Sequence, residues 1–197
     1  MKFVPKAVIG VDEAGRGPLA GPVAVGFVLV PKGFDVAKEF PGVDDSKKLT
    51  EGKREELFEM LTRRAERGDI SYCVRYGSHA MIDARGMTRV VRAAIGRGVR
   101  TLAPESRGVH VYLDGLLHAP QEYSQETVIH GDSLIPIISL ASIAAKVSRD
   151  RLMQRYEKKF PGYGFAVHKG YGTKLHYQML SELGPSEIHR RSYLPSR

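Results

Sequence analysis

Five short segments of the chain are rich in valine, isoleucine and aromatic residues, and several of them alternate apolar with polar positions. These features are typical of β-strands, because branched and aromatic side chains pack well on a pleated surface. A glycine-rich segment, residues 12–21, joins the first two strands. The predicted strands cover residues 8–11, 22–30, 70–76, 109–113 and 126–130.

Between the strands, apolar residues recur at helical spacing. Thr50 can cap a helix over residues 51–67, in which Leu57 and Leu61 share one face. Residues 31–48 lack such a pattern, and we expect a loop there. Strands that come first and then alternate with helices predict a mixed α/β sheet. The other predicted helices cover residues 79–101 with a break near Gly86, 135–160 and 173–182.

The length and the cysteine content narrow the class of protein. A chain of 197 residues without a linker suits one domain. Cys73 is the only cysteine, so no disulfide can form within the chain, which fits a reducing compartment. Asp12 and Glu13 interrupt the first apolar run too early for a signal peptide, and no stretch approaches the roughly 18 apolar residues of a membrane-spanning helix. We therefore expect a cytoplasmic protein.

Positive charge is concentrated toward the C-terminal end. The formal net charge is +8, and residues 146–197 hold eleven Lys and Arg against four acids. Five of the nine tyrosines lie in the same segment. A basic, tyrosine-rich segment on a nearly neutral body indicates a polyanionic partner such as nucleic acid. A solvated surface that only keeps the protein soluble explains the charge equally well.

Three aspartates lie just beyond predicted strands: Asp12, Asp114 and Asp132, with Glu13 beside the first. A single aspartate in such a place is usually a turn residue or a helix cap. In open α/β folds, however, binding sites gather at strand ends, so the sheet can bring the four acids together. Close carboxylates repel one another unless a cation neutralises them, and hard oxygen ligands select Mg²⁺ or Mn²⁺. The sequence therefore predicts a divalent-metal site.

The segment Gly15-Arg16-Gly17 follows the first acidic pair. With Ala20 it loosely matches a dinucleotide-binding fingerprint, but that fingerprint must open a helix, whereas a strand follows here. Two other interpretations remain. The glycines serve a tight strand connection, or they let backbone groups touch a ligand with no side chain in the way.

Further polar residues have both a structural and a functional interpretation. Tyr171 lies between glycines, which form a turn or expose its ring for stacking on a base or sugar. Ser46 and Lys47 precede a predicted helix, where they belong to its cap or bind backbone phosphate. In the long predicted helix, one arc of about 100° is either an ordinary solvent-exposed face or a row of phosphate contacts. This arc holds Ser139, Ser142, Lys146, Arg149 and Asp150.

Long segments of the chain together resemble the ribonuclease HII family, in order from about residue 8 to residue 193. The resemblance implies a ribonuclease H-like fold, a central mixed sheet flanked by helices. We therefore expect a catalytic domain over residues 1–160 and a basic C-terminal helical extension over 161–197, packed on the same domain. The matching segments are VDEAGRGPLAGPV (11–23), DSKKL (45–49), YLDG (112–115), GDS (131–133), ASIAAKVSRDRLM (141–153), GYGF (162–165), HKGYGT (168–173) and HRRSY (189–193).

The resemblance also implies an activity. Members of this family hydrolyse the RNA strand of RNA/DNA hybrids and cut 5′ of single ribonucleotides within duplex DNA, leaving 3′-hydroxyl and 5′-phosphate ends. Such an endonuclease serves ribonucleotide excision repair and RNA primer removal. Two ions of Mg²⁺ or Mn²⁺ would be bound, with Asp12 bridging both. The implied catalytic and metal-binding residues are Asp12, Glu13, Asp114 and Asp132.

The implied substrate contacts lie outside the carboxylates. The loop of Gly15, Arg16 and Gly17 would read the 2′-hydroxyl, and Tyr171 would stack on the sugar that follows the ribonucleotide. The expected partners are the hybrid and the ribonucleotide-containing duplex. We expect a monomer with no membrane and no obligate protein partner. The residues implied to hold phosphates are Ser46, Lys47, Ser139, Ser142 and Lys146.

Two places depart from the family pattern: Leu140 within SLASIAAK, and HAPQEYSQ (118–125) after the third acid. They leave the four carboxylates unchanged but bring the edge of the substrate groove into question. No sliding-clamp motif of the QxxLxxFF kind is found, so we expect no clamp partner. Two rival interpretations stay open, another nuclease of the same fold, such as a junction resolvase, and a non-catalytic module that binds hybrids.

Overall fold

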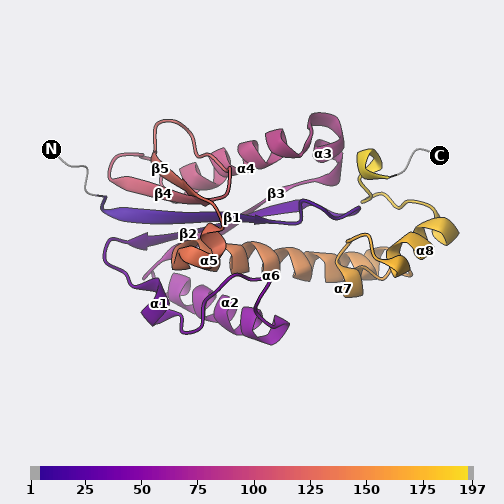
Figure 1. Cartoon of the computed structure of the whole chain (residues 1–197), viewed down its shortest axis with the longest axis horizontal. Helices are drawn as coiled ribbons and strands as arrows, with labels where there is room; N and C mark the ends of the chain where they lie inside the picture. Colours follow the sequence, from indigo (N-terminus) through magenta and orange to yellow (C-terminus); the bar gives the residue numbers. More distant parts are fainter. Residues whose placement is uncertain (1–4, 195–197) are drawn as a thin grey trace.

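A five-stranded mixed β-sheet forms the centre of the protein (Figure 1). The computed structural model describes residues 5–194. The central strand β1 runs antiparallel to β2 and parallel to β4, and β3 and β5 form the edges. This arrangement confirms the predicted mixed α/β fold. The strands are β1 (Ala7–Ala14), β2 (Val23–Pro31), β3 (Ser71–Gly77), β4 (Val109–Asp114) and β5 (Ser124–Val128).

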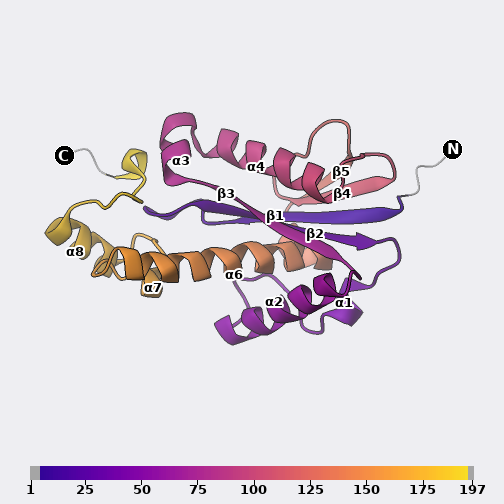
Figure 2. The same ribbon diagram turned by 180° about the vertical axis from the view of Figure 1, so that it is seen from behind.

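Helices cover both faces of the sheet, as Figures 1 and 2 show from opposite sides. These helices are α1 (Val36–Glu39), α2 (Glu51–Glu66), α3 (His79–Arg85), α4 (Met87–Leu102), α5 (Gly131–Leu134) and α6 (Pro136–Lys159). Alternating residues of the strands point to opposite faces of the sheet, and each face packs in its own apolar core. Ile9 and Val11 of β1 pack with α3 and α4 on one face, whereas Val28 and Val30 of β2 pack with α2 and α6 on the other.

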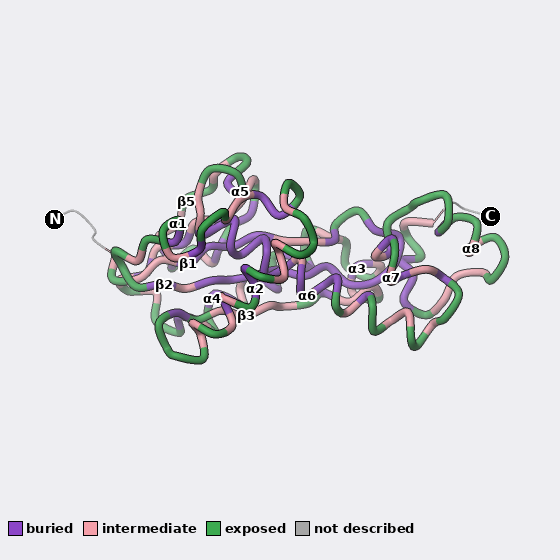
Figure 3. Tube along the Cα trace, turned by 90° about the horizontal axis from the view of Figure 1, so that it is seen from below, coloured by how far each residue is buried: buried purple, intermediate pink, exposed green. Residues whose placement is uncertain are grey.

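Two strand glycines let α6 approach the sheet closely. A Cβ at Gly10 would overlap the carbonyl oxygen of Ile137, and a Cβ at Gly26 would overlap that of Ala141. Only glycine allows a backbone-to-backbone approach of this kind. The first half of α6 is consequently buried nearly all round (Figure 3).

The burial of α6 corrects one interpretation of its polar arc. Ser139, Ser142, Arg149 and Asp150 are all buried, so this arc is not an ordinary solvent-exposed face. Neighbouring segments of the protein cover it, and its polar groups bind within the molecule. Leu140, one of the departures from the family pattern, is fully buried in the core between α6 and the sheet.

Several element boundaries differ from the sequence-based expectations. β1 continues to Ala14 because Asp12 and Glu13 pair with Gly26 and Val25 of β2, so these acids lie within the strand and not beyond it. β5 begins and ends two residues earlier than expected, and α5 follows it. The expected loop over residues 31–48 contains α1, whose first turn is capped by the Asp35 side chain.

The C-terminal segment packs at the end of α6, away from α1 and α5 (Figures 1 and 2). It contains α7 (Phe165–His168), α8 (Lys174–Leu183) and a 3₁₀ turn, η1 (Arg191–Tyr193). A small apolar cluster fastens it, in which Phe165 and Ile188 contact Met153 of α6 and Ala20 of the glycine-rich segment. None of the helices within residues 5–194 is both long and apolar enough to span a bilayer.

Candidate active site

Three elements bring the four predicted carboxylates to one end of the central strands. Asp12 and Glu13 belong to β1, and Asp114 is the last residue of the neighbouring parallel strand β4. Asp132 lies in α5, and its backbone N–H donates to Oδ1 of Asp114 over 3.4 Å. The sheet and the short helix after β5 therefore place these acids in one region.

Negative charge is dense around Asp12. This side chain is buried, and the pKa of its carboxyl lies well above the usual range, first because burial disfavours the charged form and then because Glu13 and Asp114 repel it. Burial also raises the pKa of Glu13, while the Arg16 guanidinium, 3.2 Å away, opposes that shift. Positive charge within the protein therefore compensates these carboxylates only in part.

A divalent cation fits this environment. Oε2 of Glu13 is buried and finds no hydrogen-bond partner among residues 5–194, which leaves a ligand oxygen in a place where polar atoms are normally satisfied. Carboxylate oxygens are the ligands that Mg²⁺ and Mn²⁺ prefer. Over the same residues, no three His, Cys, Asp or Glu side chains are grouped closely enough to hold an ion as they stand. The fit to a cation therefore rests on the burial and mutual repulsion of these carboxylates.

Lys47 compensates the fourth carboxylate. Its ammonium lies 3.0 Å from Oδ2 of Asp132 and 3.9 Å from Oδ1 of Asp45. The Lys47 side chain is 79% exposed, so the pair faces solvent and stabilises the fold only weakly. Lys47 thus lies at the edge of the four carboxylates, and its exposed side chain is free to move.

The three predicted phosphate-binding serines are buried and bind within the protein. Ser46 and Ser142 share a hydrogen bond of 2.8 Å between their Oγ atoms, and Ser142 also bonds the Asp12 carboxyl. Ser139 donates to the carbonyl oxygen of Asp132 over 2.7 Å. These serines therefore position two of the carboxylates, and their contact with substrate phosphate stays a prediction.

Lys146 and Tyr171 form a second group, one helical turn along α6 from Ser142. Lys146 pairs with Asp150 at 2.8 Å, and its Nζ lies 5.9 Å from the centre of the Tyr171 ring. The Arg149 guanidinium lies 5.7 Å from the same ring. The ring is 41% exposed, so it presents an aromatic surface beside positive charge.

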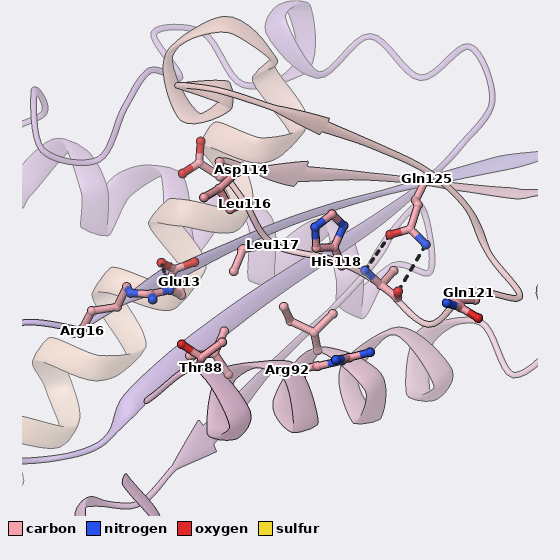
Figure 4. A pocket seen from close by; sticks show the side chains of 14 residues that line it. Glu13, Arg16, Thr88, Arg92, Asp114, Leu116, Leu117, His118, Gln121 and Gln125 are labelled. Atoms are coloured by element: carbon pink, nitrogen blue, oxygen red, sulfur yellow. Dashed lines mark hydrogen bonds and ion pairs between the residues drawn. The ribbon is translucent and has the colours of Figure 1, made fainter. Parts of the chain in front are cut away.

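The loop between β1 and β2 needs glycine at its first position. Gly15 has a φ of +92°, and a Cβ there would overlap the Arg149 side chain. A Cβ at Gly17, in contrast, would meet no described atom within 4 Å. Arg16 between them turns its side chain toward Glu13 (Figure 4). Gly15 is therefore required by packing, whereas Gly17 borders open space where a ligand can approach the backbone.

Two buried arginines hold this loop, a role that no sequence pattern indicates. Arg149 donates to the carbonyl oxygens of Pro22 (2.9 Å) and Ala20 (3.3 Å). Arg190 donates to those of Gly21 (3.0 Å), Arg16 (2.7 Å) and Gly15 (2.6 Å). Neither guanidinium pairs with a carboxylate among residues 5–194.

No sequence pattern reveals this arginine clamp, the pair Arg149 and Arg190. The residues that they hold lie 127 to 175 positions earlier in the chain. Both arginines lie in segments that carry the family resemblance, which is the only available signal. The resemblance, however, does not state which carbonyl groups they bind.

Comparison with known proteins decides the family. The family model described as ribonuclease HII matches residues 9–195 of this chain. The chain belongs to the ribonuclease HII family. A ribonuclease HII from Geobacter metallireducens is 45% identical over 187 residues, which cover 95% of this chain and 83% of that protein. The chain is accordingly a metal-dependent ribonuclease that acts on RNA/DNA hybrids.

Solved structures agree on the ribonuclease H-like fold. The ribonuclease H2 of Pyrococcus horikoshii OT3 superposes with a TM-score of 0.76 at 27% identity, covering 94% of this chain and 93% of that one. The ribonuclease HII of Archaeoglobus fulgidus, solved as a complex with PCNA, gives 0.76 at 26% identity and 96% coverage of each chain. The Bst ribonuclease HIII in complex with Mn²⁺ gives 0.68 at 18% identity, covering 93% and 64%, which shows likeness of fold alone.

Proposed function

We propose that this ribonuclease HII cuts 5′ of ribonucleotides, both in RNA/DNA hybrids and where one ribonucleotide lies within duplex DNA. Its products carry 3′-hydroxyl and 5′-phosphate ends. Asp12, Glu13, Asp114 and Asp132 are the proposed catalytic residues and the ligands of two divalent ions. The observation that carries this proposal is the buried oxygen of Glu13 that lacks a partner beside the mutually repelling Asp12 and Asp114.

Each carboxylate has its own task in this proposal. When bound, the divalent ions supply the Lewis-acid catalysis that phosphodiester hydrolysis requires. Asp12 is held in place by the Glu13 backbone N–H, which donates to its Oδ1 over 2.7 Å, and by Ser142. Glu13 offers its unpartnered oxygen. Asp114 and Asp132 complete the ligand set, and Lys47 orients Asp132 from the solvent side.

Recognition of the ribose is proposed to rest on the loop of Gly15, Arg16 and Gly17. A 2′-hydroxyl both donates and accepts hydrogen bonds, so backbone groups can tell RNA from DNA. The open space at Gly17 supports such an approach. The arginine clamp holds the carbonyls of this loop before substrate arrives, which lowers the entropy lost on binding. The 2′-hydroxyl is thus a recognition group and not the nucleophile.

The remaining contacts are proposed to bind the backbone on both sides of the cut. Lys47 and Lys146 bind phosphates, because both are charged and Lys47 is largely exposed. Tyr171 stacks on the sugar that follows the ribonucleotide, which its half-exposed ring supports. Ser46, Ser139 and Ser142 reach phosphate only after their present hydrogen bonds rearrange. The division into residues 1–160 and 161–197 stays a prediction.

The proposed setting is ribonucleotide excision repair and RNA primer removal in the cytoplasm. The Archaeoglobus relative was solved as a complex with PCNA, which is a finding about that protein. For this chain we keep the prediction of a monomer without an obligate protein partner. The Mn²⁺ complex of the Bst enzyme supports a divalent ion. The assay described next compares Mg²⁺ with Mn²⁺.

A gel assay tests the proposed function. The substrate is duplex DNA with one ribonucleotide, incubated with Mg²⁺, Mn²⁺ or EDTA beside an all-DNA duplex and a long RNA/DNA hybrid. We expect metal-dependent cutting 5′ of the ribonucleotide and none of the all-DNA strand. If only the long hybrid is cut, the single-ribonucleotide activity is wrong and the nuclease stands.

Two rivals give different results in the same assay. A junction resolvase would cut without a 2′-hydroxyl, so cleavage of a branched all-DNA substrate would favour it. A non-catalytic binding module would bind hybrid in EDTA and cut nothing with either metal. The dense carboxylate group argues against such a module, because concentrated negative charge weakens binding to a polyanion.

A further inference from the structure

A groove begins at the carboxylates and follows α4 away from α8. Its first part is a cavity of about 600 Å³ whose lining includes Glu13, Asp114, Arg16 and Arg92 (Figure 4). Its second part, about 610 Å³, shares Arg92, His118 and Gln121 with the first. The two cavities therefore adjoin each other, and we treat them as two parts of one groove. The groove lies between α4 and the segment that joins β4 to β5.

Four arginines line the second part of the groove, and α4 carries no acid. They are Arg89, Arg92, Arg97 and Arg100, all exposed. Arg100 pairs with Glu122 at 2.6 Å, which ties the helix to the β4–β5 segment. The other three form no ion pair with any residue from 5 to 194. Three positive charges on one short helix repel one another, so an anionic ligand would relieve them.

The dimensions fit a sugar–phosphate backbone. Residues 89 and 100 are eleven positions apart, which spans about 16 Å of helix at 1.5 Å per residue. A strand of a duplex advances about 3.4 Å per nucleotide, so this length matches four or five nucleotides. Leu116, 87% exposed, lines the end near the carboxylates and offers an apolar contact for a sugar. Gln121 adds an amide group along the wall, whereas the Gln125 amide bonds the backbone of Ala119 and holds this segment in shape.

We propose that this arginine groove is a second nucleic-acid-binding surface, which holds the backbone of one substrate strand as it leaves the carboxylates along α4. The proposal rests on the proposed function, because its first cavity includes Glu13 and Asp114. It assigns a role to HAPQEYSQ (118–125), which forms the opposite wall. The basic C-terminal segment and the groove then contact the substrate on opposite sides of the cut.

The test compares two triple variants of the full chain in EDTA, where binding is measured without cleavage. Arg89→Gln, Arg92→Gln and Arg97→Gln together remove the three unpaired charges, and glutamine keeps helix propensity. The matched control is Lys38→Gln, Arg63→Gln and Arg67→Gln, three exposed positions on or next to α1 and α2, on the other side of the sheet. Fluorescence anisotropy gives the Kd of a duplex with one ribonucleotide over a range of salt concentrations.

The groove variant should bind at least about tenfold more weakly at low salt. Its plot of log K against log salt should lose a slope of about 2.7, at 0.9 per phosphate contact. Lengthening the duplex on one side of the ribonucleotide should strengthen wild-type binding and leave the groove variant unaffected. The control should follow the wild type throughout. With Mg²⁺, the control should cut 5′ of the ribonucleotide like the wild type, whereas the groove variant should cut at the same position with a KM raised in proportion to its Kd.

Equal salt slopes for the wild type and the groove variant would overturn the groove and leave the proposed function intact. An acidic protein would then be the better candidate ligand for the groove. Conversely, a wild type that shows the expected slopes yet never cuts would overturn the proposed function, while the groove would stand as a binding surface. If the wild type bound none of the nucleic-acid duplexes, both the groove and the proposed function would be overturned.

Discussion

The four carboxylates and a histidine cluster in the C-terminal segment are both ionisable, yet their polar atoms differ in how completely they are hydrogen-bonded. At the carboxylates, Glu13 keeps a buried oxygen without a partner. In the cluster of His168, His176 and His189, every ring nitrogen is bonded. His168 donates to the carbonyl of Tyr163 and accepts from the Gly170 N–H.

The tautomers of the other two rings follow from their partners. His176 Nδ1 donates to the Tyr171 carbonyl over 2.9 Å, so its Nε2 carries no proton. His189 Nδ1 accepts from the Ser186 N–H, so its Nε2 donates to His176 across 2.9 Å. The cluster is complete when all three rings are neutral, and it holds Tyr171 by its backbone. A satisfied cluster supports structure, whereas an unsatisfied one is prepared for a ligand.

The largest effect should come from neutralising the carboxylate group. Asp12→Asn should lower the cleavage rate by about 10⁴-fold or more, because residues that act as one catalytic unit fail together. The same change should leave the free energy of unfolding in EDTA unchanged or raise it, since it removes a buried charge that Glu13 and Asp114 repel. Single-turnover cleavage and urea unfolding measure the two. Near-normal turnover would contradict the assignment of Asp12.

Loss of one clamp arginine should lower both the free energy of unfolding and the preference for ribose over deoxyribose at the cut site. Arg190→Ala leaves three carbonyls without their charged donor, which should cost about 3 kcal/mol or more in the free energy of unfolding. Arg190→Lys should fold better and still lose preference for ribose over deoxyribose at the cut site. Arg191→Ala, at the exposed neighbouring position, should change neither quantity. A lysine variant with wild-type preference would show that the clamp does not position the loop.

The two groups should respond to pH in opposite directions. Burial lowers the pKa of His189 to about 4, well below its unfolded value of about 6.5. The unfolded chain therefore binds the extra proton first as pH falls, and stability is lost between about pH 6.5 and 4, by up to about 3 kcal/mol. The raised pKa values of Asp12 and Glu13 give the opposite sign, because the folded chain then binds protons more tightly than the unfolded one.

Urea unfolding in EDTA between pH 4.5 and 7.5 separates these contributions. His189→Gln should flatten the acid loss, since an amide can still donate toward His176 without titrating. His118→Gln, at an exposed position, should leave the loss unchanged. Identical pH profiles for the wild type and His189→Gln would rule out the cluster as the source.

The smallest effect should come from Tyr171. Tyr171→Ala should reduce cleavage at a single embedded ribonucleotide by roughly tenfold, the loss of one stacking contact, and should affect long hybrids less. Tyr171→Phe keeps the ring and should behave like the wild type. Steady-state kinetics on the two substrates measure the difference. An equal loss on both would refute a role at the junction between RNA and DNA.

Local patterns predicted the elements of this fold, since the strands and helices each bury a face with its own period. They failed where pairing partners decide the outcome. The polarity of Asp12 and Glu13 suggested that β1 ends before them, but Gly26 and Val25 of β2 continue the ladder. Residues 31–48 lack helical periodicity because α1 is a single turn, capped by Asp35.

The sequence allowed the placement of the four candidate acids in one region to be predicted, but not the contacts that hold them. Aspartates after strands gather because adjacent strands end together, which short-range reasoning captures for Asp114. The hydrogen bonds of Arg190 join residues up to 175 positions apart, and no period or spacing encodes such contacts. Likewise, the polar arc of α6 gave no sign that its serines turn inward to the carboxylates.

Because Gly10 and Gly26 have no side chains, the distance between α6 and the sheet can vary very little, and the geometry of the site depends on that distance. Gly26 stands opposite Asp12 in the β1–β2 ladder, and its Cα faces the backbone of α6. Most helices pack on their sheet through a layer of side chains that can repack when a residue changes. At these two glycines the strand backbone contacts the helix backbone directly, so no side chain can repack to accommodate a change. A single methyl group at position 26 would overlap the α6 backbone at Ala141, and the shift of α6 that relieves this overlap would carry the neighbouring Ser142 away from Asp12.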